Sequence, residues 1–287
     1  MDCAIPLPNT GLNMEVTESS LYVRVGKEIH HYLRADMSLA ARVQLFKKDG
    51  KARGLLACSD WLFVRDFIML HQLDAQTLEP VRAWKLGDNA SSDICAFCGD
   101  ESTVYAAIRG GGMAVIDVAS GNVTHHALAD TGMWSLALRD AVLYAACVSG
   151  ELLEIRRDDM RVTRRQPVHR KNIYSVVRDG DVLYTTAQDG ALMATRAGDF
   201  STLCMAKKAT ANMTTAIGVH GDALITANPD RSQLTFWNKH SLTADQVIAF
   251  PTGGLNHKGI VMHGGSVYGS DGNGIYALAL ESCHPVG

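Results

Sequence analysis

The sequence lacks a long hydrophobic run and an excess of charge of one sign. None of its apolar stretches approaches the roughly 18 residues that a membrane-spanning helix needs. Its 27 Lys and Arg stand against 30 Asp and Glu, a formal net charge of −3 that gives no reason to expect a nucleic-acid coat protein. The first residues include an early acid and two prolines but no basic segment, so we expect no secretory signal. A globular chain of 287 residues remains.

A regular cysteine framework is also missing. The seven cysteines are scattered, and an odd number without regular spacing argues against structural disulfides. This favours a reducing, cytoplasmic location. Cys95 and Cys98 form the one CxxC pair, but on a strand positions three apart point to opposite faces. We therefore predict no metal site or redox site there.

Catalytic motifs are absent as well. The sequence has no HExxH, His-x-His or Gly-x-Ser-x-Gly pattern. The adjacent pairs His30-His31 and His125-His126 would diverge on a strand. Residues 110–112 are three glycines, but no helix follows them to form a phosphate-binding loop, so a tight turn with positive φ is favoured. We predict that the chain has no cofactor and no metal, and we favour a binding protein over an enzyme.

The sequence does contain a repeat, the first feature to seek in such a chain. An apolar pair of the Leu-Tyr type recurs with its second member at positions 22, 63, 105, 144, 184, 225 and 268, so the spacings are 41, 42, 39, 40, 41 and 43. β-branched and aromatic runs flank each pair, bounded by Gly, Asp and Asn, which is typical of strands and turns. Helical periodicity is hard to find.

Four short strands in each unit of about 41 residues predict one blade of a β-propeller. We therefore predict an all-β, seven-bladed propeller of four-stranded antiparallel blades, because blades must stack to bury their faces. The chain would be a single domain, 1–287, with blades at about 11–50, 51–89, 90–130, 131–169, 170–210, 211–252 and 253–287 plus 1–10. The last unit lacks its outer strand. We expect Ala4–Leu7 to supply it, since proline suits an edge strand.

Two segments carry a family resemblance. Leu224–Leu242 has Asp230 in the turn between its second and third strands and Trp237 in its third strand. In these positions it resembles a WD40 repeat, whereas Gly112–Val123 resembles a blade of the YVTN and lactonase-type propellers. The whole chain thus resembles the WD40 and quinoprotein-like propeller superfamily. It lacks the Gly-His and Trp-Asp dipeptides of that pattern, so the resemblance implies incomplete structural tetrads.

Four aspartates occupy matching turns in different repeats. They could suggest a ring of carboxylates for Ca²⁺, but Asp in such turns usually bonds local backbone N–H groups, and this turn role is favoured. The residues are Asp66, Asp189, Asp230 and Asp271.

One charged segment is conspicuous. Residues 155–171 contain seven Arg and Lys but only Asp158 and Asp159, and they fall on the expected outer strands of the fourth blade. The first interpretation is a solvated edge strand that resists aggregation. The alternatives are a docking patch for an acidic partner protein or, less favoured, for anionic lipid or nucleic acid. The candidate rim residues are Arg156, Arg157, Arg161, Arg164 and Arg165.

The loops at the top face form the second candidate surface, since Trp, Met and Arg are typical of protein-binding hot spots. We predict a non-enzymatic WD40-like scaffold that binds other proteins, as a subunit of a complex. The alternative is a small-molecule-binding or hydrolytic, lactonase-like propeller with its site at the central channel, near Arg231, Asn256 and His257. The candidate top-face residues are Arg53, Arg65, Arg109, Trp134, Arg170, Lys171, Met213, Arg231, Asn256, His257 and Lys258.

Overall fold

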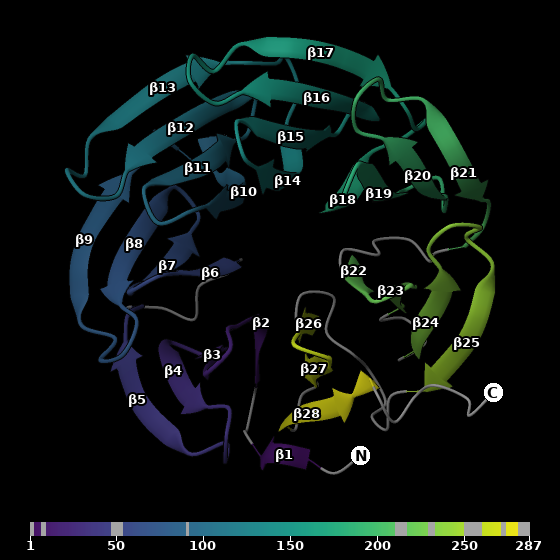
Figure 1. Cartoon of the computed structure of the whole chain (residues 1–287). Coiled ribbons are helices and arrows are strands. Elements are labelled where there is room, and N and C mark those ends of the chain that lie inside the picture. The colour runs from purple at the N-terminus through teal and green to yellow at the C-terminus, as the bar shows by residue number, and fades with distance from the viewer. Residues whose placement is uncertain are drawn as a thin grey trace. The chain divides into compact units, whose positions relative to one another are not determined.

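The computed structural model describes residues 3–6, 10–46, 54–89, 92–209, 217–228, 233–249, 260–270 and 274–280. They form seven four-stranded antiparallel sheets, so the predicted seven-bladed β-propeller fold is confirmed (Figure 1). Blades are numbered here in chain order. The first strand of a sheet is called its inner strand and the last its outer strand. No helix among the described residues is long and apolar enough to cross a membrane.

The chain divides into two compact units, described separately. The first holds blades 1, 2 and 7. Blade 1 contains β2 (Thr10–Val16), β3 (Ser20–Val25), β4 (Glu28–Leu33) and β5 (Leu39–Gln44). Blade 2 contains β6 (Gly54–Cys58), β7 (Trp61–Asp66), β8 (Met69–Asp74) and β9 (Pro80–Lys85). Blade 7 contains β26 (Ile260–His263), β27 (Ser266–Ser270), β28 (Gly274–Ala279) and β1 (Cys3–Pro6).

The second unit holds blades 3 to 6. Blade 3 contains β10 (Ile94–Gly99), β11 (Thr103–Ile108), β12 (Gly112–Asp117) and β13 (Val123–Ala127). Blade 4 contains β14 (Met133–Arg139), β15 (Val142–Cys147), β16 (Glu151–Arg156) and β17 (Val162–Pro167). Blade 5 contains β18 (Ile173–Asp179), β19 (Val182–Ala187), β20 (Leu192–Arg196) and β21 (Thr202–Ala206). Blade 6 contains β22 (Ile217–His220), β23 (Ala223–Asn228), β24 (Gln233–Asn238) and β25 (Ala244–Ala249).

The N-terminal strand completes the last blade. β1 lies beside β28, with Ile5 opposite Ile275 and Pro6 opposite Gly274. The prediction that Ala4–Leu7 supplies this strand is confirmed, although Leu7 itself lies outside the described residues.

The Leu-Tyr pair recurs because its two side chains serve two different blade interfaces. Successive residues of a strand point to opposite faces of the sheet. Leu21 packs in a cluster with Tyr268 and Ile275 of blade 7. Tyr22 packs in another with Leu73 of blade 2.

The tyrosine hydroxyls add hydrogen bonds between neighbouring blades. Tyr22 donates to the carbonyl oxygen of Ala75 at 3.0 Å, and Tyr184 donates to that of Lys239 at 3.1 Å. Ala75 and Lys239 each stand first in the turn between the third and fourth strands of the next blade. A buried tyrosine hydroxyl is thus satisfied across the interface, so the anchor position favours Tyr over Phe.

The residue that follows the third strand is bonded alike in all seven blades. Its backbone N–H donates to a carbonyl of the turn before the second strand, and the donors are Arg34, Ala75, Val118, Arg157, Ala197, Lys239 and Leu280. Asp74 and Asn238 are the last residues of the third strands of blades 2 and 6. Their side chains also accept backbone N–H groups of the turn that follows. This recurrent short-range bonding explains why the strand spacing varies so little along the chain.

Candidate functional site

Blades 3, 4 and 5 present their turns at one common end within the second unit. Each inner strand begins beside the end of the second strand, in the pairs Ile94–Ile108, Met133–Cys147 and Ile173–Ala187. We call this the loop end.

A β-bulge repeats at the loop end on three inner strands. The strand register skips one residue in each, and the inserted residues are Cys95, Trp134 and Tyr174. The rings of Trp134 and Tyr174 lie 5.6 Å apart between centroids and are tilted by 32°. Tyr174 is buried and Trp134 is partly exposed. Bulges redirect side chains and are common beside functional sites, and here they bring two aromatic rings together across two blades.

A second contact holds these two blades in register. The backbone N–H of Val176 in β18 donates to Ser135 Oγ in β14 at 3.1 Å. The aromatic pair therefore lies on a fixed part of the framework.

The loop end also carries basic residues. Arg109 is exposed and forms a two-point ion pair with the buried Asp93, including an Nη2–Oδ2 contact of 3.2 Å. The hydrogen bond to Asp93 raises the pKa of Arg109. Arg170 and Lys171, both exposed, lie in the segment before β18. Among the described top-face candidates, these three residues and Trp134 belong to one end of one unit.

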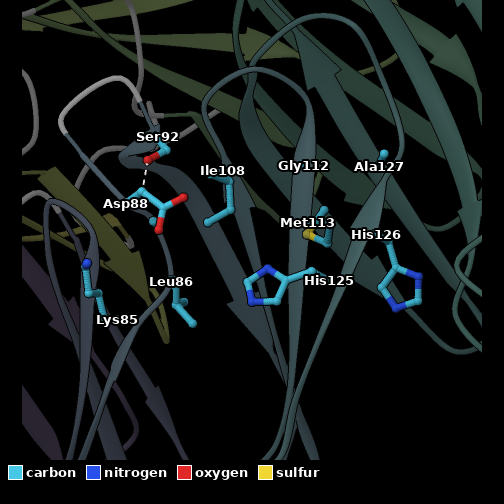
Figure 2. A pocket seen from close by; sticks show the side chains of 11 residues that line it. Lys85, Leu86, Asp88, Ser92, Ile108, Gly112, Met113, His125, His126 and Ala127 are labelled. Carbon is cyan, nitrogen blue, oxygen red and sulfur yellow. Dashed lines mark hydrogen bonds between the residues drawn. The ribbon is translucent and has the colours of Figure 1, made fainter.

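A pocket of about 590 Å³ opens at the loop end of blade 3. Its apolar floor includes Leu86, Ile108 and Met113, all buried. Figure 2 shows polar side chains around this floor. The polar and remaining lining residues are Lys85, Gly87, Asp88, Ser92, Gly112, His125, His126 and Ala127.

The triple glycine closes this end of blade 3. Gly110 and Gly111 have φ of 93° and 95°, so the predicted turn with positive φ is confirmed. The carbonyl of Gly111 accepts the N–H groups of Leu128 and Ala129. A Cβ on Gly111 would lie 2.0 Å from the Ala129 oxygen, so only glycine allows this approach.

Blade 5 contains a buried polar network behind the loop end. His169 lies with Nε2 2.8 Å from Thr185 Oγ1 and Nδ1 3.3 Å from Asp189. Asp189 also accepts the backbone N–H groups of Ala191 and Arg170 at 3.0 and 3.2 Å. The prediction that Asp189 bonds local backbone in its turn is confirmed.

The two ionisable members of this network shift in the same direction. Burial lowers the pKa of His169, against the opposing charge of Asp189. Burial alone would raise the pKa of Asp189, but hydrogen bonds from Ala191 and the proximity of His169 outweigh it and lower the pKa. Both side chains are held by contacts within the blade, which indicates a structural role.

Blade 6 carries the complementary part of such a network. Trp237 Nε1 donates to Thr226 Oγ1 at 2.9 Å, and both side chains are buried. The His-Thr-Asp contacts of blade 5 and the Trp-Thr contact of blade 6 agree with the incomplete tetrads implied by the WD40 resemblance.

The arginines of the predicted rim patch have different surroundings. Arg157 ion-pairs with Asp100, donates to Tyr105 Oη at 2.9 Å and lies over that ring at 5.4 Å. Arg164 lies over the Phe200 ring at 5.3 Å and contacts Glu154. These two contacts tie blade 4 to blade 3 and to blade 5.

The other rim arginines lie nearer to solvent. Arg156 pairs with Asp158 and Asp159, and Arg165 lies 3.6 Å from Asp130. Arg161 is exposed, and no ion-pair partner is found for it among the described residues. Spatial neighbours therefore balance most of the charge that the segment 155–171 concentrates in sequence.

Several sequence candidates are placed elsewhere or not described. Arg65 lies within β7 and is only 3% exposed, so it is part of the interior and not of a loop. Asp66 ends the same strand. Outside the described residues lie Arg53, Met213, Arg231, Asn256, His257 and Lys258, and also Asp230 and Asp271.

The histidines and cysteines of the described chain serve local contacts. His31 Nε2 lies 2.9 Å from Ser20 Oγ, and His30 Nε2 lies 2.8 Å from Glu28. Burial raises the pKa of the Cys98 thiol to about 12, so it stays protonated and is a poor ligand or nucleophile. No group of three or more His, Cys, Asp or Glu among the described residues could hold a metal ion.

Comparison with known proteins supports the fold. No protein-family model matches the chain, and no curated protein sequence does. The β-propeller domain of Cps50 (Swd1) from Myceliophteria thermophila is similar in structure, with a TM-score of 0.79 and 10% identity over 97% of this chain and 99% of that one.

Two further solved structures are similar. BamB from Moraxella catarrhalis has a TM-score of 0.69 and 15% identity over 93% of this chain and 83% of that one. The computationally designed protein Ika8 has a TM-score of 0.70 and 10% identity over 97% of both chains. Identities this low show the fold alone, and the predicted seven-bladed β-propeller fold is confirmed.

Proposed function

We propose that the chain is a non-enzymatic interaction scaffold that binds a partner protein at its loop end. The observation that carries this proposal is the partly exposed Trp134, whose ring lies tilted beside that of Tyr174 across two blades. Trp and Tyr on a rigid framework, with Arg nearby, are the residues that dominate protein-binding hot spots. The basic residues Arg109, Arg170 and Lys171 favour an acidic surface on the partner.

The interior chemistry is consistent with this role. The described histidines that lie inside blades are held by neighbouring side chains and carbonyls, as His169 is by Thr185 and Asp189. Such groups stabilise blades. A propeller fold by itself hosts many functions, so the proposal rests on the site.

The test is affinity purification from the source cells with partners identified by mass spectrometry. Trp134→Ala is compared with Leu39→Ala, which removes an exposed apolar side chain from the outer strand β5. We expect a stoichiometric partner that Trp134→Ala loses and Leu39→Ala keeps. A partner that both variants retain equally, or no partner with the wild type, would contradict the proposal.

A second candidate function is small-molecule binding in the pocket of blade 3. Its volume of about 590 Å³ lies within the usual range of ligand sites, and it combines an apolar floor with His125, Lys85 and Asp88. A ligand screen by thermal shift tests this candidate. A hit that His125→Ala abolishes would favour it over the scaffold.

A further inference from the structure

The outer strand of blade 5 differs from the outer strands of the other six blades. An outer strand presents one row of backbone N–H and C=O groups that no neighbouring strand covers, and proteins usually protect it with charge or proline. β21, with the sequence TLCMA, contains no charged residue, no histidine and no proline. Each of the other six contains at least one: Pro6 in β1, Arg42 in β5, Arg82 in β9, His125 in β13, Pro167 in β17 and Asp245 in β25.

The side chains of β21 divide cleanly between two faces. Cys204 and Ala206 pack against the cluster that includes Tyr184 and Trp237. Leu203 and Met205 alternate with them and are 45% and 43% exposed. No other outer strand among the described residues has two large exposed apolar side chains on one face.

β21 has one bulge, at Leu203, where its register with β20 shifts by one residue, and its pairing is regular from Cys204 to Ala206. Met205 lies opposite Met193, and Cys204 lies opposite Ala194 of β20. In Figure 1, β21 lies at the edge of its sheet, beyond β20, and no described strand pairs with its other side. Beyond this bulge, a strand that is paired on one side only is a template for adding another strand.

Positive charge marks one end of this edge. Lys207 and Lys208 follow the strand directly, are exposed, and form no ion pair with other described residues. Asp199, before the strand, is already bonded to Ser201 at 2.9 Å and to Arg196 at 3.4 Å. The surplus charge at β21 is therefore cationic and lies at its C-terminal end.

We propose that β21 binds an extended acidic segment of a partner protein, which joins blade 5 as a fifth, antiparallel strand. Apolar residues at alternate positions of the segment cover Leu203 and Met205, and acidic residues at its N-terminal end face Lys207 and Lys208. Main-chain hydrogen bonds supply the affinity and the side chains supply the specificity. This surface is the outer edge of blade 5, its cationic end points toward the loop end, and it extends the scaffold function to a second contact.

A partner segment fits this edge better than a second copy of the chain does. Pairing two copies through a strand of five residues would bury little area beside the roughly 1,200 Å² of a stable interface. It would also bring the lysines of one copy to Asp199 of the other, whose carboxylate is already engaged.

The test uses the whole chain and a labelled synthetic peptide, two glutamates followed by alternating valine and threonine, with binding followed by fluorescence anisotropy. Met205→Lys should weaken binding at least about 10-fold, because it places a charge on the apolar edge. The matched control Val247→Lys changes the exposed apolar residue of β25 and should leave the affinity within about 2-fold.

Peptide controls separate strand pairing from charge attraction. N-methylation of alternate backbone amides should abolish binding, since it removes the main-chain donors. Lys207→Glu with Lys208→Glu should weaken binding about 10-fold. Trp134→Ala should leave it unchanged, so failure here is distinguishable from failure of the loop-end proposal.

Three results would overturn the strand proposal: no binding by the wild type, equal binding of the N-methylated peptide, or equal binding by Met205→Lys. Light scattering supplies a fourth. A dimeric wild type that becomes monomeric in Met205→Lys would assign the edge to a second copy of the chain. Circular dichroism and thermal unfolding must show that each variant is folded.

Discussion

Blades 4 and 5 are neighbours built on one plan, but their polar residues lie in different places. Blade 5 buries His169, Thr185 and Asp189 as a network. In blade 4 the equivalent positions are Ala129, Ala145 and Ser149, by the pairing of strands and turns. Blade 4 instead carries its charge on the outer strand β17, whereas β21 of blade 5 has none. Blade 5 thus has its polar side chains around His169 and an uncharged outer strand, whereas blade 4 has alanine at two of the matching network positions and a charged outer strand.

The difference shows that local charge in a sequence is a poor guide to a binding surface. Arg157 of blade 4 contacts Asp100 and Tyr105. Arg164 contacts Glu154 and Phe200. The uncharged β21 is the described outer strand that leaves two large apolar side chains, Leu203 and Met205, exposed on one face.

The largest effect is expected at the junction of the two blades. Gly150 has φ of 87°, and a Cβ there would lie 2.3 Å from the His169 oxygen, while its own carbonyl accepts two N–H groups of the segment that leads to blade 5. Gly150→Ala should lower the free energy of unfolding by about 3 kcal/mol or more, measured by urea denaturation.

A matched glycine in blade 5 is the control for this change. Gly180 has φ of 56° with nothing within 4 Å of an added Cβ, and Asp140 already adopts φ of 49° in the same turn of blade 4. Gly180→Ala should cost only about 1 kcal/mol. Equal losses in the two variants would show that the junction is not as closely packed as described.

The next prediction compares two arginines, Arg157 and Arg161, that lie close together in the sequence but have different surroundings in the structure. Arg157→Ala removes an ion pair, a hydrogen bond to tyrosine and a cation–π contact between blades, and should lower the free energy of unfolding by about 2 kcal/mol. Arg161→Ala, at an exposed position, should change it by less than about 0.5 kcal/mol. If chemical denaturation gives the reverse order, the structural role assigned to Arg157 is wrong.

A smaller effect concerns the pH dependence of the free energy of unfolding that His169 of blade 5 should contribute. Burial lowers the pKa of His169, so the unfolded chain binds this proton more readily than the folded chain does. The contribution to stability is complete above the ordinary His pKa of about 6.5 and is lost as pH falls through the lower folded pKa.

His169→Asn should therefore flatten the fall in stability below about pH 6.5. His125→Asn, on the exposed face of β13, is the control and should keep the wild-type slope. Unfolding measured from pH 5 to 8 decides the point. A wild-type slope in His169→Asn would exclude this residue as its source.

The repeat could be recognised from the sequence because each blade repeats the same local requirements. The Leu-Tyr pair serves two blade interfaces, and the residue after the third strand is hydrogen-bonded alike in every blade. Such short-range bonds produce a fixed spacing in the sequence. The role of the N-terminal strand in completing blade 7 could be predicted because the last unit lacks an outer strand of its own.

The loop end was less predictable, because its contacts join residues far apart in the chain. Asp93 is fixed by Arg109, and Trp134 meets Tyr174 only because each is inserted by a bulge. One signal was present: Cys95, Trp134 and Tyr174 follow one another at spacings of 39 and 40, close to the repeat length. The burial of Arg65 within β7 had no comparable signal.

The contrast between the outer strands of blades 4 and 5 is tested most directly by one binding measurement. The acidic peptide is titrated into the wild type, into Met205→Lys and into a variant that combines Arg161→Gln with Arg165→Gln. The account predicts an affinity within about 2-fold of wild type for the arginine variant and at least about 10-fold weaker for Met205→Lys. Binding that falls with the arginines and persists in Met205→Lys would place the interaction on blade 4 and contradict the account.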